Sequence, residues 1–330
     1  MREDADPMLD DAYYKERQAR FQRILERIGG RYAFELISPE HGDIWTRYQP
    51  ETTVSGRSFL SACAYALEDV MYCREDAELG YLTVLLMESD NHLLAFPPMG
   101  AYEPERFAAV IRRMRHMFGL AGEPFRLAYM SEREAEWVRA LPDFTVWTDP
   151  GENDYVYCVS ELTRFDGPEN ANRRMNHSRF LRRHRAETRR IEPGRGGCLE
   201  DCAGIIEAWC TGRGCDSCGF RCPRDTALRT VRDLDRFRAS GGIMYADGEP
   251  EALMLLGDMG GGMTDMLNIF ARHRYSGLSY ALIDQVCRLC IPDTRYLNFE
   301  EDMGIPNLRR FKESLHPAFT LPKYRACVTV

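Results

Sequence analysis

The sequence predicts an α/β (α+β) protein of two domains, each with a mixed, mostly antiparallel β-sheet flanked by helices. Three observations support this. The chain has 330 residues, and a domain usually holds roughly 100–200 residues. Apolar runs of strand length alternate with stretches of helical periodicity. The order of elements in the first half returns, in longer form, in the second, so we place the domains at residues 1–160 and 161–330.

In the first half, helical periodicity marks the helices and short apolar runs mark the strands. Residues 12–28 repeat apolar side chains at helical spacing until Gly29 and Gly30 end the pattern. Ser131 followed by Glu134 forms a capping box. The elements expected here are a helix over 12–28, a strand over 32–38, a helix capped by Ser38, a hairpin over 80–98, a helix over 103–119, a strand over 125–130, a helix over 132–141, and strands over 144–149 and 154–160.

The second half follows a related order. Its hairpin is predicted to turn at Asp247-Gly248, a pair that favours tight β-turns. The elements expected here are a basic helix over 168–190, helices near 200–211 and 223–239, a hairpin over 241–259, a strand over 263–271, a helix over 277–290, a strand over 294–301, a helix over 305–315 and a strand over 324–330.

Composition limits the classes of function. The net charge of −8 and pI of about 5.5 argue against a protein that coats nucleic acid with its whole surface, but they leave room for a local basic patch. No apolar run reaches ~18 residues, so we expect no transmembrane segment. The acidic start MREDADPMLDD does not resemble a signal peptide. We therefore expect a cytoplasmic protein whose twelve cysteines are reduced thiols or metal ligands.

A phosphate-binding pattern occurs where the strand 263–271 meets the next helix. Arg274, Tyr275, Gly277 and Ser279 lie at this junction. A helix N-terminus presents unpaired N–H groups and partial positive charge, and glycine lets a ligand approach the backbone. The spacing resembles the R/Q-x-x-G-x-G/A loop with which GNAT acyltransferases hold a pyrophosphate, with serine in place of the last glycine or alanine. The alternative is an ordinary strand–helix turn. In the first half PPMGAYEP stands at the corresponding place.

The basic helix carries eight arginines between residues 173 and 190 against one acid, Glu187. Such clustering in an acidic protein indicates a surface for phosphates, tRNA or anionic lipid headgroups. The alternative is a solvated helix neutralised by acidic loops of the same chain. The arginines expected to contact the polyanion are Arg173, Arg174, Arg182 and Arg183.

A cysteine cluster raises the alternative of a structural zinc ion. Cys215 and Cys218 form a Cys-x-x-Cys pair, with Cys210 and Cys222 on either side. Four thiolates suit zinc. The spacing is compressed, however, because ligand pairs are usually separated by ~12 or more residues. We therefore assign no metal, and keep zinc at these four cysteines as the alternative to reduced thiols.

Several segments together resemble a known family. They are DYVYCVSEL, NRRMNHSRFLRRH, EAWC, GGIMYADGEPEALMLLG, YSGLSYALI and YLNFEEDMGIPNLRRFKESLHP. The chain resembles, over nearly its whole length, the proteins that share the catalytic C-terminal domain of phosphatidylglycerol lysyltransferase, which are Fem-related and fold as two tandem GNAT-like domains. The resemblance implies transfer of an acyl or aminoacyl group. In the lysyltransferase the donor is a charged tRNA and the acceptor a lipid headgroup.

The resemblance also implies where the chemistry takes place. In the GNAT arrangement the two central strands splay apart and the acyl group enters between them, beside the segment 296–317. A carboxylate of Glu300 or Asp302 would take a proton from the acceptor. Lys312 would stabilise the tetrahedral intermediate or hold a donor phosphate, and Asn298 would orient the carbonyl. The alternative is that these residues fix the loop by capping and ion pairing.

Two functions of different class follow. The first is an acyl- or aminoacyltransferase with aminoacyl-tRNA or acyl-CoA as donor, a hydroxyl or amine as acceptor and peripheral contact with anionic lipid. The second is a non-catalytic protein whose GNAT-like halves hold a small ligand or an anionic partner.

Overall fold

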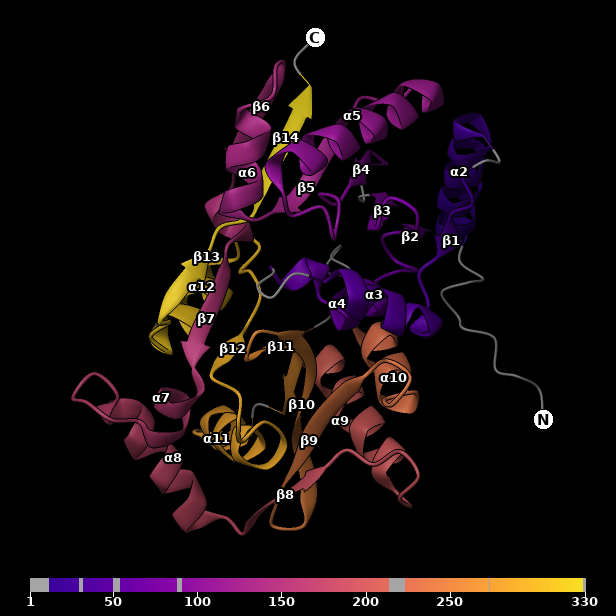
Figure 1. Ribbon diagram of the computed structural model, residues 1–330. Coiled ribbons are helices and arrows are strands. Elements are labelled where there is room, and N and C mark those ends of the chain that lie inside the picture. The colour runs from indigo at the N-terminus through magenta and orange to yellow at the C-terminus, as the bar shows by residue number, and fades with distance from the viewer. Residues whose placement is uncertain are drawn as a thin grey trace. The chain divides into compact units, whose positions relative to one another are not determined.

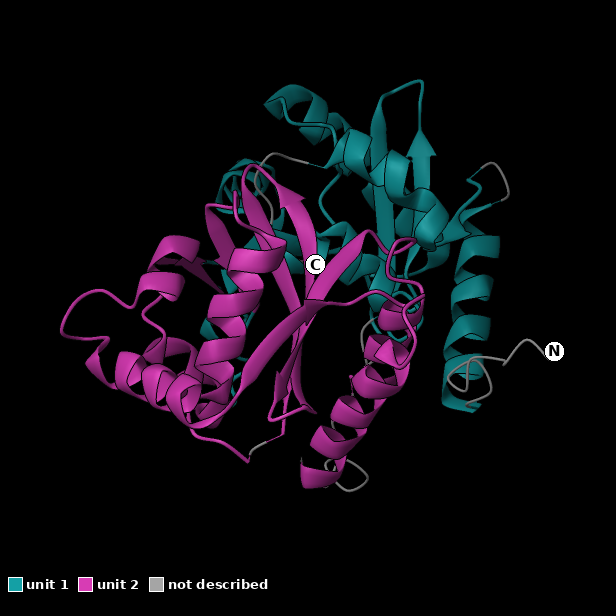
Figure 2. Cartoon of the chain, turned by 90° about the horizontal axis from the view of Figure 1, so that it is seen from below, with its two compact units in different colours: residues 1–154, 301–305, 321–330 teal, residues 155–300, 306–320 magenta. Residues whose placement is uncertain are grey.

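The computed structural model describes residues 12–29, 32–49, 54–87, 91–213, 223–272 and 274–328 (Figure 1). The chain forms two compact units, which Figure 2 colours separately. Unit 1 contains Met1–Asp154, Glu301–Ile305 and Leu321–Val330, and unit 2 contains Tyr155–Glu300 and Pro306–Thr320. This division differs from the contiguous ranges 1–160 and 161–330, because two short C-terminal segments belong to unit 1.

Unit 1 holds a seven-stranded sheet of order β1-β2-β3-β4-β5-β14-β6. Only the β4–β5 pair is parallel; the other neighbours run antiparallel. The strands are β1 Glu35–Leu36, β2 Tyr72–Asp76, β3 Tyr81–Met87, β4 Leu93–Ala95, β5 Arg126–Met130, β6 Phe144–Thr148 and β14 Tyr324–Val328. The helices are α2 Ala12–Ile28, α3 Gly42–Tyr48, α4 Phe59–Ala64, α5 Pro104–Ala121 and α6 Glu132–Arg139, with 3-10 turns η1 Pro39–His41, η2 Ser55–Arg57 and η3 Pro150–Glu152.

Unit 2 holds a second seven-stranded sheet, of order β13-β7-β12-β11-β10-β9-β8. The β11–β12 pair is parallel, whereas β7–β12, β10–β11, β9–β10 and β8–β9 are antiparallel. The strands are β7 Asp154–Cys158, β8 Ala186–Arg190, β9 Ala239–Ala246, β10 Glu249–Gly260, β11 Met263–Ala271, β12 Tyr296–Asn298 and β13 Phe319–Leu321. The helices are α7 Val159–Arg164, α8 Ala171–Arg183, α9 Cys198–Arg213, α10 Arg224–Arg232, α11 Leu278–Cys290 and α12 Pro306–Ser314.

Each sheet buries its own apolar core. In unit 1, Phe21 and Ile24 of α2 pack with Phe107 and Met114 of α5 over the sheet. In unit 2, α11 covers one face and α9 with α10 the other (Figure 1). Trp209 of α9, for example, packs edge-on against Phe270 of β11. Two mixed, mostly antiparallel sheets flanked by helices confirm the predicted fold class.

Local turn chemistry is confirmed where a short motif determines it. Asp247 and Gly248 both have positive φ, 56° and 96°, as a two-residue type I′ turn requires. Ser131 and Glu134 form the capping box of α6. Of the helices in the described parts of the chain, none is both long enough and apolar enough to cross a membrane.

Three expectations about elements were wrong. The basic helix ends at Arg183 rather than at 190, because residues 186–190 form β8 and pair with β9. The final strand, β14, inserts between β5 and β6 of unit 1 instead of joining the second sheet. The helix expected over 223–239 is α10, which ends at Arg232. For β8 and β14, pairing with strands distant in sequence determined the structure, and local periodicity carries no information about such pairing.

Candidate active site

The two parallel strands of unit 2 stay paired for only three positions. β11 and β12 match Met263 with Tyr296 and end at the pair Asp265–Asn298. β11 then carries a bulge at Leu267, since Leu255 pairs with Asn268 and Leu256 with Met266, and continues to Ala271. Among the described residues, no strand pairs with 266–271 on the side of β12. This edge therefore presents backbone hydrogen-bonding groups beside the end of β12.

Asn298 and Glu300 lie where β12 ends. Asn298 is fully buried, and its Oδ1 accepts a hydrogen bond of 2.8 Å from the backbone N–H of Glu300. Glu300 has a positive φ of 58°, which is uncommon for a residue with a side chain. Its carbonyl accepts from the N–H of Tyr155 at 3.1 Å. The half-buried Glu300 side chain thus projects from a tightly fixed turn.

Lys312 of α12 fixes this turn from the other side. Its ammonium is buried, donates to the carbonyl oxygens of Phe299 and Glu300 (3.1 Å to the latter), and lies 5.9 Å from the ring centre of Tyr155. The hydroxyl of Tyr157 donates to the carbonyl of Lys312 at 2.8 Å, and burial raises the pKa of Tyr157. In this geometry Lys312 positions the backbone that carries Glu300.

Asp302 belongs to unit 1, unlike Asn298, Glu300 and Lys312. It is fully buried, and its Oδ1 accepts from the N–H of Gly304 at 2.7 Å. This is a turn-capping contact of the kind that the structural alternative predicts for this residue.

The neighbouring Glu301 enters a buried ionic network in unit 1 that sequence reasoning missed. The Nζ atom of Lys323 contacts Glu301, the Oδ1 of Asp154 at 2.7 Å and the Oγ of Ser55 at 2.9 Å. Ser55 in turn donates from its N–H and its hydroxyl to Asp154, both at 2.7 Å. Lys323 and Ser55 are 268 residues apart in the sequence, so no local motif predicts this network.

The predicted donor loop is packed against α8. Gly277 caps α11 with φ 94°, and a Cβ there would lie 2.3 Å from the carbonyl oxygen of Asn176. His177 of α8 also contacts Asp284 of α11 at 3.0 Å, and the ring of Tyr275 lies 4.4 Å from that of His184. The close approach of α8 therefore explains why glycine occupies position 277. Ser279 lies half-buried in the first turn of α11.

Arg274 makes an ion pair rather than standing alone at the loop. Its Nη1 lies 3.3 Å from Oε1 of Glu251, a fully buried carboxylate that sequence reasoning missed. Burial raises the pKa of Glu251, although Arg274 and Arg272 oppose this shift. The Oε2 of Glu251 has no hydrogen-bond partner among the described residues. An anion that binds Arg274 would therefore compete with this carboxylate.

The four arginines expected to bind a polyanion are not equivalent. Arg173 is buried, its Nη1 donates to the carbonyl of Leu315 at 2.8 Å, and burial lowers its pKa. Including Arg173 in the basic surface was therefore wrong, because the helix turns this side chain into unit 2. Arg174, Arg182 and Arg183 are exposed, and Arg174 donates to the carbonyls of Phe165 and Gly167.

The cysteine cluster is only partly described. Cys210 is buried in α9, whereas Cys215, Cys218 and Cys222 lie outside the described residues. Within the residues that the structure does describe, no group of three or more His, Cys, Asp or Glu side chains is placed to hold a metal ion. The zinc alternative remains a prediction.

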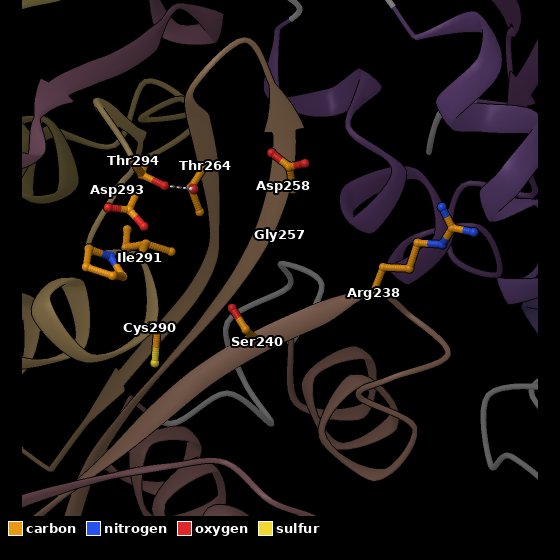
Figure 3. A pocket seen from close by; sticks show the side chains of 10 residues that line it. Arg238, Ser240, Gly257, Asp258, Thr264, Cys290, Ile291, Asp293 and Thr294 are labelled. Carbon is orange, nitrogen blue, oxygen red and sulfur yellow. Dashed lines mark hydrogen bonds between the residues drawn. The ribbon is translucent and has the colours of Figure 1, made fainter.

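A polar pocket of about 290 Å³ opens at the start of β11, at the end of this strand away from the donor loop. Thr264 and Thr294, which both line it, are hydrogen-bonded to each other at 3.1 Å, and Asp258 and Asp293 also belong to its lining (Figure 3). None of the residues predicted for the site lines this pocket. Of the predicted residues, Asn298, Glu300 and Lys312 lie together at the end of β12. Arg274, Tyr275, Gly277 and Ser279 lie at the start of α11.

Comparison with known proteins determines the family. The family model for the C-terminal part of phosphatidylglycerol lysyltransferase matches residues 55–327. The chain belongs to this family. A comparison with curated proteins found no match.

Solved structures share the fold of this lysyltransferase family member. A conserved protein of unknown function from Bacteroides thetaiotaomicron VPI-5482 superposes with a TM-score of 0.82 at 21% identity, covering 90% of this chain and 100% of that one. The C-terminal domain (DUF2156) of a putative lysylphosphatidylglycerol synthetase from Agrobacterium fabrum superposes with a TM-score of 0.64 at 12% identity, and the match covers 88% of this chain and 90% of that one. L-PGS from Bacillus licheniformis also superposes with a TM-score of 0.64, at 14% identity, and the match covers 89% of this chain and 93% of that one. Family and fold together indicate a transferase of acyl or aminoacyl groups.

Proposed function

We propose that unit 2 transfers an activated aminoacyl or acyl group from a tRNA- or CoA-type donor to a hydroxyl or amine acceptor. The observation that carries this proposal is the short β11–β12 pairing, which ends at Asp265–Asn298 and leaves residues 266–271 without a strand partner on that side. An extended donor group can hydrogen-bond along such an edge, as an added strand does. Its carbonyl would then lie beside the turn at Glu300.

The proposed chemistry needs one base and one leaving group. The Glu300 carboxylate takes the proton of the acceptor hydroxyl or amine as its oxygen or nitrogen attacks the donor carbonyl. A new ester or amide bond forms through a tetrahedral intermediate. The donor's ester or thioester bond then breaks, and the proton passes to the leaving oxygen or sulfur. Lys312 and Asn298 hold the turn, so that the base keeps its place during these steps.

The packing of α8 favours an aminoacyl ester over a CoA thioester as donor. A pyrophosphate bound under Gly277 would need the space that the Asn176 carbonyl occupies. It would also compete with Glu251 for Arg274. A tRNA donor can instead place its phosphates on the exposed Arg174, Arg182 and Arg183 of α8, because backbone phosphates bind clustered arginines. Such a donor would place the reaction in the cytoplasm.

The name of the family supplies a first acceptor to test. Phosphatidylglycerol lysyltransferase is named for lysyl transfer to a lipid, so we propose an anionic lipid headgroup as acceptor and peripheral contact with that lipid. The experiment supplies purified protein with tRNA charged with labelled amino acids, or with labelled acyl-CoA, and with phosphatidylglycerol vesicles. We expect label in the lipid fraction from charged tRNA and none from acyl-CoA. No transfer from either donor class to lipid, amine or hydroxyl acceptors would contradict the proposal.

One observation favours the second function, a non-catalytic binding protein. Both anion-binding features of the donor loop are engaged within the chain, Arg274 by Glu251 and Gly277 by α8. If the protein binds charged tRNA or anionic lipid but turns over neither, this second function stands. Turnover in the transfer assay excludes it.

A further inference from the structure

A second basic feature lies in unit 1, on a helix to which the transfer reaction assigns no role. A groove of about 350 Å³ runs along α2 beside the end of α5. The described residues that line it include four arginines and two glutamates, which together carry a formal charge of four minus two, or +2, in a chain whose net charge is −8. The charged residues are Arg17, Arg20, Arg23, Arg27, Glu16 and Glu123.

Helix geometry aligns the arginines. They recur every three or four residues, and the ten steps from Arg17 to Arg27 cover about 15 Å at 1.5 Å per residue. Phe21 and Ile24, on the adjacent stripe, are buried in the core of unit 1 and hold the helix in place. The arginine row therefore sits on a fixed support rather than on a loose surface helix.

Contacts with carbonyl groups orient two of the guanidinium groups. Arg17 is 2% exposed and donates to the carbonyl of Glu68 at 2.6 Å and to that of Met87. Arg27 donates to the carbonyl of Ala121 at 3.2 Å. Arg17 lines the wall of the groove, and Arg27 lines it as an exposed residue.

The other two arginines complete the site. Arg23 is exposed and has no hydrogen bond or ion pair with any residue in the described ranges. Arg20 pairs with Glu123 at 3.3 Å, and its buried Nε has no partner within those ranges. Glu123 is therefore the internal acid with which a bound anion would compete for Arg20.

We propose that this groove binds a phosphate group on a small ligand. A guanidinium presents paired donors that match the oxygens of a phosphate, and several arginines around one small space suit an anion with more acceptor atoms than a single carboxylate. The volume lies near the lower end of small-ligand sites, roughly 300–1,000 Å³, which fits a headgroup rather than a long polymer. The phosphate can belong to a free phosphorylated metabolite or to a lipid headgroup. The proposal does not depend on the transfer reaction.

The experiment measures binding rather than turnover. Inorganic phosphate and glycerol 3-phosphate are titrated calorimetrically into the full chain, and flotation is measured with phosphatidylcholine vesicles that contain or lack phosphatidylglycerol. We expect Arg23→Gln/Arg27→Gln to weaken binding by about tenfold or more, because charge-assisted hydrogen bonds are lost. Arg112→Gln/Arg115→Gln, which removes the same charge from α5 outside the groove, should bind like the wild type.

A gain-of-binding variant guards against unfolding as the explanation. Glu123→Gln removes the acid that holds Arg20, and we expect tighter binding of the same probe. Changes confined to the soluble phosphates assign a free metabolite, and changes confined to flotation with phosphatidylglycerol assign a lipid headgroup. Equal affinities for wild type, groove variant and control variant would overturn the proposal, as would the absence of binding to every probe.

Discussion

The ammonium nitrogen of Lys312 lies 3.1 Å from the carbonyl oxygen of Glu300, and it also donates to the carbonyl of Phe299. The next helix, α12, thus holds the turn that carries Glu300, the residue that we propose as the base. Lys312→Met should destabilise the protein by about 1.5–3 kcal/mol, the typical worth of hydrogen bonds to a charged group. Chemical denaturation measures this. Arg310 is an exposed neighbour, and Arg310→Met should lower the free energy of unfolding by no more than about 0.5 kcal/mol. Equal effects would show that the Lys312 contacts contribute nothing.

Gly277 and Gly248 provide a matched pair that separates backbone strain from packing. Their φ values are 94° and 96°, but a Cβ at Gly277 would meet Asn176 at 2.3 Å, whereas at Gly248 the nearest atom, on Arg185, is 4.0 Å away. Because φ is positive at both sites, alanine at either one should lower the free energy of unfolding by about 1–2 kcal/mol through backbone strain alone. We expect Gly277→Ala to cost distinctly more in thermal or chemical unfolding. Equal losses would mean that α8 does not press on the loop.

A glutamate at position 277 would introduce both a bulky side chain and a negative charge. Gly277→Glu should abolish donor binding if the loop holds the donor, but it would also displace α8. Donor binding must therefore be compared between Gly277→Ala and Gly277→Glu. A loss seen only with the glutamate indicates repulsion of an anion, and a similar loss with both indicates packing.

Lys323 should contribute strongly to the stability of unit 1. Lys323→Met leaves the buried Asp154 carboxylate without its cation, and such changes typically cost about 3–5 kcal/mol. The double variant Lys323→Met/Asp154→Asn should recover a substantial part of this loss, because both charges are then gone. The free energy of unfolding for the wild type, two single variants and double variant gives the coupling. Strictly additive losses would show that the two side chains do not interact.

The pH dependence of this network has a definite sign. Burial alone would lower the pKa of Lys323, but the carboxylates of Asp154 and Glu301 outweigh it and hold the pKa well above its ordinary value of 10.5. A cation whose pKa is raised on folding stabilises fully below its unfolded value, and this contribution is lost as pH rises through the folded value. The difference in unfolding free energy between wild type and Lys323→Met should therefore stay constant from neutral pH to about 10 and shrink above that. A difference that grows with alkaline pH would contradict this assignment.

The arginines of α8 should separate into binding and structural residues. Arg182→Gln/Arg183→Gln should weaken tRNA binding and lower the slope of log affinity against log salt by roughly 0.7–0.9 per lost phosphate contact. Arg173→Gln should instead lower the unfolding temperature, because its guanidinium is buried against the Leu315 carbonyl. Filter binding over a salt series and thermal unfolding measure the two effects. If Arg182→Gln/Arg183→Gln leaves the salt slope unchanged, α8 is not the polyanion surface.

Sequence reasoning succeeded where a few adjacent residues determine the structure. The hairpin at Asp247-Gly248 and the cap at Ser131–Glu134 are examples, since glycine, aspartate and serine act on their own backbone. It failed where the partner is distant in sequence. β14 pairs with β5 and β6, roughly two hundred residues earlier, and nothing in YRACV specifies which sheet it joins.

The candidate site shows the same limit. Residue type and position drew attention to Asn298, Glu300 and Lys312, which the structure gathers at the end of β12. Sequence did not reveal that Lys312 binds carbonyl oxygens, that Glu251 pairs with Arg274, or that Arg173 is buried. These contacts depend on how α12, β10 and α8 pack within unit 2. An arginine-rich run alone does not say which of its side chains face inward.

The most direct measurement of the central claim compares the transfer rates of Glu300→Gln and Glu313→Gln under single-turnover conditions with charged tRNA and phosphatidylglycerol vesicles. Glu313 is exposed on α12, so its change controls for the loss of one charge near the site. We predict that Glu300→Gln lowers the rate ~10²–10⁴-fold while binding donor as the wild type does, because removal of a general base has this effect. Glu313→Gln should react at the wild-type rate. A Glu300→Gln variant with near wild-type turnover would remove Glu300 from the mechanism and contradict this account of the site.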